Sequence, residues 1–357
     1  MPLLPLYGHE ALRERLRQAI RRDALPQSLL LHGVPGAGKQ RLALWIAQTI
    51  LCERRDPPCG ECRHCRYVLG LTHPDLLWVF PRPRPKDGDR DAEEVRNDLV
   101  AAAQERLESH GLYAPPSGSE GIFVSTVRAM VHQAAVTPAL ARRKVFVVGD
   151  ADRLVPQEGS EQAANAFLKL LEEPPNDTHV ILTSSALGAL LPTIRSRAAA
   201  VRVPPLADAD VRAFLNDAVV KEMLDRRELP PSVTDRVALA AGAPGLLFAL
   251  GNHSAASAAA GRLLDAATGN DRAALMRAAF MQGSSGARGG FADVLDALTV
   301  RLHTRARSAA TRGDDHGADA ASRAALLVED AKLLATNNLN PQLVTVRLLN
   351  QLRDVLA

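Results

Sequence analysis

A glycine-rich loop between an apolar run and a helical pattern constrains the fold of this chain more than any other feature. The loop reads Gly33-Val-Pro-Gly-Ala-Gly-Lys-Gln40 and directly follows the apolar run Ser28–His32. It matches the P-loop pattern except at its last position. Glycines let backbone N–H groups close around phosphate oxygens at a helix N-terminus, and Lys39 can reach the outer phosphates. The expected nucleotide-binding residues in this loop are Gly33, Gly36, Gly38, Lys39 and Gln40.

Three further apolar runs predict the rest of the fold. Leu76–Phe80, Lys144–Val148 and His179–Thr183 have the composition of buried strands, and helical patterns separate them. Strands that alternate with helices predict a doubly wound parallel sheet. After Pro205 the chain is rich in Ala, Leu and Arg with helical spacing. The expected fold class is therefore an α/β P-loop domain followed by helical domains.

Size and charge exclude several classes of protein. The chain has 357 residues, of which 46% are hydrophobic, and its 43 basic and 40 acidic residues give a net charge of +3. This length is enough for two or three hydrophobic cores. The small net charge provides no global attraction to nucleic acid, so any DNA contact is expected to be local. No stretch approaches the ~20 apolar residues of a membrane span, and a cytoplasmic location without membrane partners is expected.

The metal-binding position of the P-loop departs from that of an active ATPase. Gln40 stands where a Ser or Thr hydroxyl would bind Mg²⁺, and its neutral amide is a poor substitute. After the strand at 144–148, an Asp for the metal and a Glu for the attacking water are expected, but the chain has Gly149 and Asp150. Asp150 takes the place of the Glu with a shorter side chain, and Asp152 is as readily a cap for the following turn. ATP or ADP bound without hydrolysis is the expectation.

All four cysteines lie close together, in the pattern Cys52-x6-Cys59-x2-Cys62-x2-Cys65. Four thiolates at short spacing in a reducing compartment suit a structural, tetrahedral Zn²⁺ with Zn–S bonds of ~2.3 Å. An iron–sulfur cluster is the main alternative, and disulfides are disfavoured by the compartment. His64 is expected to be a surface residue because the four cysteines complete the ligand set.

Several motifs together carry a resemblance to a known family. They are the P-loop, the cysteine knuckle after it, Asn165–Pro175, Leu190–Arg197 and Asn337–Pro341. This combination resembles the bacterial DNA polymerase III clamp-loader subunits, most closely the delta-prime type, over nearly the whole chain. The resemblance implies an AAA+ domain at 1–203, a helical lid at 204–252 and a C-terminal helical collar at 253–357. Within the first domain it includes a zinc module at 50–70. The resemblance does not cover residues 82–120, whose turn-rich composition predicts a surface insertion that is partly mobile.

The resemblance also implies roles for single residues. The family's Ser-Arg-Cys signature supplies an arginine finger to a neighbour's ATP, and here it reads Ser196-Arg197-Ala198. Arg197 is therefore the implied finger, although a surface salt bridge is the simpler alternative. Thr183 or Ser184 matches the polar sensor at a strand end. The sensor arginine of the lid falls on Gly245.

The implied function is that of a clamp-loader subunit that helps to load the sliding clamp onto primed DNA. No autonomous ATPase activity is expected of this accessory part of a DNA polymerase (nucleotidyltransferase) holoenzyme. Its implied partners are the delta and tau/gamma subunits and, through the assembly, the clamp and primer-template DNA. An ATP-hydrolysing tau/gamma-type motor or another AAA+ ATPase is the alternative. A zinc-dependent DNA-binding module is a weaker one, because the chain lacks interleaved basic and aromatic residues.

Overall fold

The structure is a computed structural model that describes residues 2–83, 91–112, 120–154, 161–227, 229–250, 254–269, 271–281, 288–336 and 339–356. The chain divides into two compact units, each with its own core. Unit 1 comprises Met1–Pro116, Glu120–Met223 and Pro230–Phe248, and unit 2 comprises Ser117–Ser119, Leu224–Leu229 and Ala249–Ala357. The boundaries predicted for the lid and the collar stay predictions.

Unit 1 is built on a five-stranded parallel sheet with the order β2-β3-β4-β1-β5. The strands are β1 (Ser28–His32), β2 (Leu76–Val79), β3 (Lys144–Val148), β4 (Thr178–Ser184) and β5 (Ala199–Arg202). The first four are almost continuously buried, as expected for a parallel sheet covered on both faces. β5 is an edge strand that is largely exposed, and the sequence analysis did not predict it.

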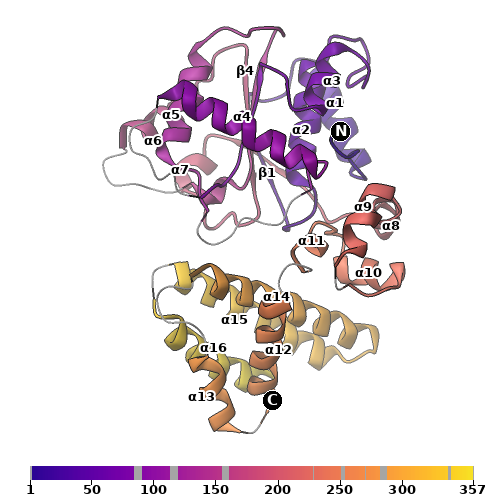
Figure 1. Cartoon of the computed structure of the whole chain (residues 1–357), viewed down its shortest axis with the longest axis vertical. Helices are drawn as coiled ribbons and strands as arrows, with labels where there is room; N and C mark the ends of the chain where they lie inside the picture. The colour runs from indigo at the N-terminus through magenta and orange to yellow at the C-terminus, as the bar shows by residue number, and fades with distance from the viewer. Residues whose placement is uncertain are drawn as a thin grey trace. The chain divides into compact units, whose positions relative to one another are not determined.

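Helices cover both faces of this sheet. They are α1 (Glu10–Arg21), α2 (Lys39–Leu51), α3 (Arg63–Leu69), α4 (Ala92–Glu108), α5 (Val124–Ala135), α6 (Glu161–Glu172) and α7 (Pro192–Arg195). In Figure 1, α5 and α6 lie on one side of β1 and β4, α1, α2 and α3 lie on the other, and α4 crosses in front of these strands. Apolar side chains of α5 and α6, such as Met130 and Leu171, join one core cluster, while those of α1 and α2, such as Leu16 and Ile46, join the second.

The segment at 82–120 differs from the expected surface insertion. It contains α4, whose N-terminus is capped by Asp91 through hydrogen bonds from the backbone N–H groups of Glu93 and Glu94 at 2.9 and 2.8 Å. Val95 and Leu99 are buried against the sheet. The apolar spacing of this helix is obscured because two of its four buried residues are alanines. Residues 84–90 and 113–119 lie outside the described part of the chain.

Four short helices follow the sheet: α8 (Asp208–Leu215), α9 (Ala218–Asp225), α10 (Val233–Ala240) and α11 (Leu246–Leu250). They are tied to the N-terminal segment by Tyr7, whose hydroxyl donates to an Asp217 carboxylate oxygen at 2.6 Å and whose ring meets Phe214 edge-on. The turn between α10 and α11 lies next to the P-loop, where Gly245 approaches Gly36 closely.

Unit 2 is a bundle of α12 (Ser254–Thr268), α13 (Arg272–Phe280), α14 (Arg288–Thr311), α15 (Asp315–Thr336) and α16 (Pro341–Leu356). The last helix, α16, contributes apolar side chains to the core of this bundle. Leu349 and Leu352 are fully buried, whereas Val346, Val355 and Leu356 only flank the core. No helix of the described residues is long and apolar enough to cross a bilayer. The predicted fold class, an α/β P-loop domain with a parallel sheet followed by helical segments, is confirmed.

Candidate functional site

The P-loop connects β1 to α2 and is shaped by glycines. A Cβ on Gly33 would lie 2.2 Å from the carbonyl oxygen of Val203, so only glycine fits this close approach. Gly38 has a φ of 86° and immediately precedes α2, which begins at Lys39. The unpaired N–H groups of the first turn of α2 therefore border the loop, as phosphate binding requires.

Lys39 is held by groups of its own chain. Its Nζ donates to the carbonyl oxygens of Gly33 at 3.0 Å and Val34 at 2.8 Å, and to Ser185 Oγ at 2.8 Å. Burial lowers the pKa of Lys39 to about 8, although the charges of Asp150 and Asp152 act in the opposite direction. Ser185 was not among the predicted site residues. The only indication of its role in the sequence is that it directly follows the expected sensor pair, Thr183 and Ser184.

The side chain of Gln40 is fixed at both ends of its amide. Trp78 Nε1 donates to Gln40 Oε1 at 3.0 Å, and Gln40 Nε2 donates to Asp150 Oδ2 at 2.8 Å. A Cβ on Gly149 would lie 2.2 Å from Gln40 Oε1. The two departures from the ATPase pattern are therefore one arrangement, because the long amide occupies the space that a side chain at 149 would need. Trp78 was also missed, since no pattern connects β2 to the P-loop.

Asp150 and Thr183 meet at the ends of β3 and β4. The backbone N–H of Asp150 donates to Thr183 Oγ1 at 3.0 Å, and Asp150 has the left-handed φ of 49°. Burial, together with the smaller effect of the charge of Asp152, raises the pKa of Asp150 to about 6. Ser184 serves the next turn, where its Oγ accepts from the Ala186 N–H at 3.1 Å. Asp152 Oδ1 accepts from the Ser185 N–H at 3.3 Å.

The turn between α10 and α11 packs on the P-loop through backbone atoms. The N–H of Gly245 donates to the carbonyl oxygen of Gly36 at 3.0 Å. A Cβ on Gly245 would lie 2.8 Å from Gly36 Cα, and one on Gly36 would lie 2.7 Å from the nitrogen of Leu246. A larger residue at 245, such as the arginine that the family resemblance implies, does not fit this arrangement.

The four cysteines form one compact cluster. All four Sγ atoms lie within 4.8 Å of one another, and the Cys59–Cys65 and Cys52–Cys62 pairs are both 3.9 Å apart. The edge of a tetrahedron with Zn–S bonds of ~2.3 Å is about 3.8 Å, so the donor set fits a tetrahedral Zn²⁺. The backbone N–H groups of Cys62 and Cys65 donate to Cys59 Sγ at 3.3 Å and Cys62 Sγ at 3.4 Å. These bonds fix two of the four sulfurs, those of Cys59 and Cys62, within the cluster.

His64 is buried, with only 3% of its surface exposed, so its expected place on the surface is wrong. Its Nδ1 lies 2.8 Å from His73 Nε2, and His73 Nδ1 accepts from the backbone N–H of Asp75 at 3.0 Å. Because His73 Nδ1 is an acceptor, its ring proton resides on Nε2 and points to His64. The pair joins the cysteine module to the residues that precede β2.

Arg197 follows α7 and contacts α6. Its Nε donates to Glu172 Oε2 at 3.0 Å, and its Nη1 donates to the carbonyl oxygen of Thr193 at 3.0 Å. The next residue, Ala198, is buried in the core of unit 1, where a larger cysteine side chain would have to be accommodated. Arg195, two residues earlier, is exposed. The ion pair expected as the simpler reading of Arg197 is present, and the finger role stays a prediction.

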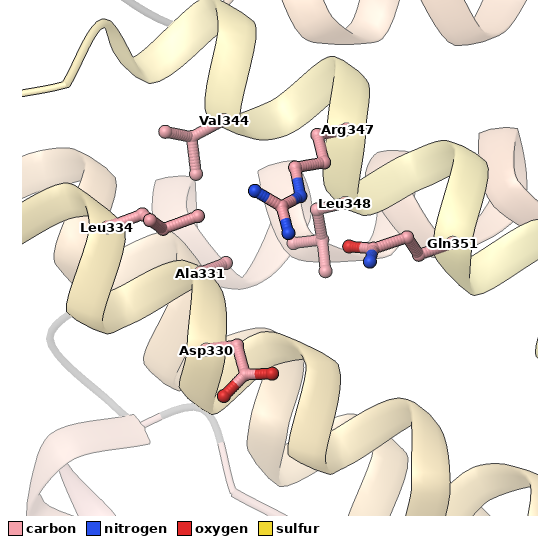
Figure 2. Close-up of a pocket in the computed structure, with 7 residues that line it drawn as sticks. All are labelled: Asp330, Ala331, Leu334, Val344, Arg347, Leu348 and Gln351. Atoms are coloured by element: carbon pink, nitrogen blue, oxygen red, sulfur yellow. The ribbon is translucent and has the colours of Figure 1, made fainter.

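A hollow between α15 and α16 of unit 2 offers no ligand site. Figure 2 shows the residues that line it, which are Asp330, Ala331 and Leu334 of α15 and Val344, Arg347, Leu348 and Gln351 of α16. Its volume is about 20 Å³, which is room for about one water molecule. The P-loop region and the cysteine cluster of unit 1 are therefore the better candidates for binding.

Comparisons with known proteins identify relatives of this chain. The sequence model of one family, described as "DNA polymerase III, delta subunit", matches residues 8–207. A "DNA polymerase III subunit delta'" of Bacillus subtilis is 27% identical over 224 residues, which cover 62% of this chain and 55% of the relative. Another from Pseudomonas aeruginosa is 30% identical over 217 residues, which cover 60% and 52%. The chain thus spans about half the length of these relatives.

A gamma subunit and a solved structure are also similar to this chain. A "DNA polymerase III subunit gamma" of Buchnera aphidicola is 26% identical over 194 residues, which cover 54% of this chain and 42% of the relative. A gamma subunit-related protein of Thermotoga maritima has a solved structure that aligns with a TM-score of 0.44 at 16% identity, over 96% of this chain and 99% of that one.

Proposed function

The chain belongs to the DNA polymerase III delta-subunit family, and from this membership we propose that it is a clamp-loader subunit that does not hydrolyse ATP. It helps to load the sliding clamp onto primed DNA as part of an assembly with delta and tau/gamma subunits. Within that assembly it completes the ATP site of a neighbouring subunit. For this role the chain needs an intact fold and an exposed residue that contacts the neighbour, but it needs no metal-dependent chemistry of its own.

One observation carries the proposal: the amide of Gln40 is bound between Trp78 and Asp150. Phosphoryl transfer at a P-loop uses Mg²⁺ held by the hydroxyl at this position. Gln40 Oε1 already accepts from Trp78, and its amide nitrogen has no free lone pair for a metal. With Gly149 where the metal-binding carboxylate would stand, two protein contributions to the magnesium site are missing together.

The backbone contact of Gly245 with Gly36 supports the same proposal. An arginine from the lid is the usual group that senses the outer phosphate in the family that this chain resembles, and position 245 has no space for one. ATP or ADP can bind passively only if the ammonium of Lys39 exchanges its contacts with Gly33, Val34 and Ser185 for phosphate oxygens. Weak binding without turnover is therefore the proposed behaviour.

Arg197 is the residue proposed to act on a neighbour. A planar guanidinium neutralises the charge that develops on the transferred phosphoryl group, and such fingers are worth roughly 10³ to 10⁵ in rate in well-studied cases. The side chain of Arg197 keeps 30% of its surface exposed, so solvent and a partner surface can reach it. The zinc ion proposed for the cysteine cluster has a structural part only and takes no part in this chemistry.

The purified chain tests the first half of the proposal. It should show no ATP turnover above background, and Lys39→Ala should leave that background unchanged. Robust hydrolysis that Lys39→Ala abolishes would instead establish the motor-type alternative.

The complete loader tests the second half. Arg197→Ala should lower the ATP turnover stimulated by DNA and clamp, and it should lower clamp loading more strongly, while the assembly stays intact. Arg197→Lys should recover little, because a point charge cannot reproduce the planar fork. Arg195→Ala is the matched control and should behave as the wild type. Equal effects of the two alanine variants would leave the subunit as a scaffold only.

A further inference from the structure

We propose that Glu172 is a positioning residue for Arg197, holding its guanidinium so that the remaining nitrogen, Nη2, points to a phosphate of a neighbouring subunit. The inference rests on the proposed function of Arg197 in trans. It adds a second residue, on a different helix, to the part of the chain that acts on the neighbour.

The guanidinium of Arg197 is fixed at two of its three nitrogens. Nε donates to Glu172 Oε2 and Nη1 donates to the carbonyl oxygen of Thr193, both at 3.0 Å. Within the described residues, no hydrogen bond engages Nη2. Two bonds from one planar group to two fixed acceptors determine the orientation of its plane, and they leave Nη2 as the donor for a third ligand.

The helix that carries Glu172 is anchored immediately before it. Leu171 is 1% exposed and belongs to the core of unit 1. The carbonyl oxygen of Leu171 accepts from Ser28 Oγ of β1 at 2.7 Å, and Gln27 Nε2 donates to the carbonyl oxygen of Pro175 at 2.7 Å. The carboxylate of Glu172 therefore extends from a backbone whose position is set by the sheet.

The segment that carries Arg197 is anchored in the same core. Ile194 and Ala198, on either side of it, are 2% and 8% exposed and join the cluster that contains Leu171. The carbonyl oxygen of Thr193 accepts from Ser196 Oγ at 3.1 Å as well as from Arg197. Arg197 and its two acceptors, Glu172 and the carbonyl oxygen of Thr193, are therefore all anchored in the same core. Such common anchoring allows the acceptors to fix the orientation of the guanidinium.

The strength of the pair suits an orienting role. The Glu172 side chain is 57% exposed and that of Arg197 is 30% exposed, so water screens their attraction. Exposed ion pairs of this kind are weak: they favour one rotamer but do not withhold the guanidinium from a phosphate. Glu173 is exposed like Glu172 and, within the described residues, makes no hydrogen bond or ion pair with Arg197, so it provides a matched control.

The experiment uses the complete loader containing full-length variants of this chain, with stimulated ATP turnover, the KM for ATP and complex integrity as readouts. Glu172→Ala should remove about half of the turnover that depends on Arg197, the two-fold effect expected of an exposed pair worth a few tenths of a kcal/mol. The KM for ATP should stay unchanged, because a finger acts on the transition state. Glu172→Gln should retain most of the turnover, since its amide oxygen still accepts from Nε, and Glu173→Ala should match the wild type.

The Arg197→Ala background separates the possible failures. If Glu172 acts through Arg197, then Glu172→Ala should change nothing further in that background. If Arg197→Ala lowers turnover but Glu172→Ala does not, or raises it, the positioning role is wrong and the proposed function stands. If Glu172→Ala lowers turnover equally with and without Arg197, it acts through the fold and the positioning role is likewise wrong. If Arg197→Ala itself has no effect, the proposed function fails.

Discussion

Substitutions of Gln40 and Gly149 should have non-additive effects on the free energy of unfolding, because the side chain of Gln40 fills the space next to Gly149. Gly149→Ala places a Cβ 2.2 Å from Gln40 Oε1, and overpacking of this kind costs about 1–3 kcal/mol of the free energy of unfolding. In a Gln40→Ala background the same substitution should cost markedly less, although Gln40→Ala is itself destabilising because Trp78 loses an acceptor. Urea denaturation of the four proteins measures the coupling. Gly188→Ala, where a Cβ meets nothing within 4 Å, is the control, and strictly additive effects would contradict the fit.

His179 gives a pH dependence with a defined sign. It is 5% exposed, and burial lowers its pKa to about 4. As the pH falls from about 6.5 to about 4, His179 becomes protonated in the unfolded chain but stays neutral in the folded one. The free energy of unfolding therefore decreases by about 3 kcal/mol over this range. His73 acts in the same direction, whereas the raised pKa of Asp150 acts in the opposite one. The free energy of unfolding should therefore be compared between the wild type and His179→Gln, and parallel pH curves would refute the assignment.

The site residues that could be predicted from the sequence are those that belong to one continuous motif. The glycines and Lys39 lie within eight residues, and the P-loop pattern locates them directly. Trp78 and Ser185 come to the same place from two other strands, and no local pattern links them to Gln40. His64 was misplaced for the same reason, since its burial depends on a partner ring nine residues away. Contacts between distant segments are what the sequence does not show.

Among the strands, β1 to β4 were predicted because each is an unbroken apolar run, the pattern of a strand covered on both faces. β5 reads Ala-Ala-Val-Arg and carries no such run. It becomes a strand because its backbone pairs with β1, from Leu29 opposite Ala199 to His32 opposite Arg202. Helix α4 was missed because alanines supply half of its buried face. Elements whose structure depends on a neighbour are hidden from pattern analysis.

The cysteine module should depend on metal for its stability. Metal analysis of the purified chain should return one zinc per molecule, and Cys62→Ser should lower both the occupancy and the Tm, because metal binding is linked to folding. A strong chelator should lower the Tm of the wild type and have a much smaller effect on Cys62→Ser. Iron in place of zinc, or carefully prepared protein without metal, would overturn the proposed structural zinc.

The two units have separate cores, and they should separate in function. A chain that ends at Phe248 retains the sheet with both of its core clusters, so it should still unfold cooperatively. It should fail to enter the loader, whereas a fragment from about residue 253 to the C-terminus should bind the other subunits. Size-exclusion chromatography of reconstituted mixtures measures both. Entry of the shortened chain with unchanged affinity would show that the C-terminal helices are not the assembly surface.

The contact between Gly36 and Gly245 also restricts which substitutions position 245 can accept. A mutation that put arginine at 245 would drive a side chain into the loop before that arginine could be of any use, because the added Cβ lies 2.8 Å from Gly36 Cα. The lid turn would first have to move away, and no single substitution does both. The close approach of these two backbones therefore restricts position 245 to glycine for as long as the turn stays on the loop.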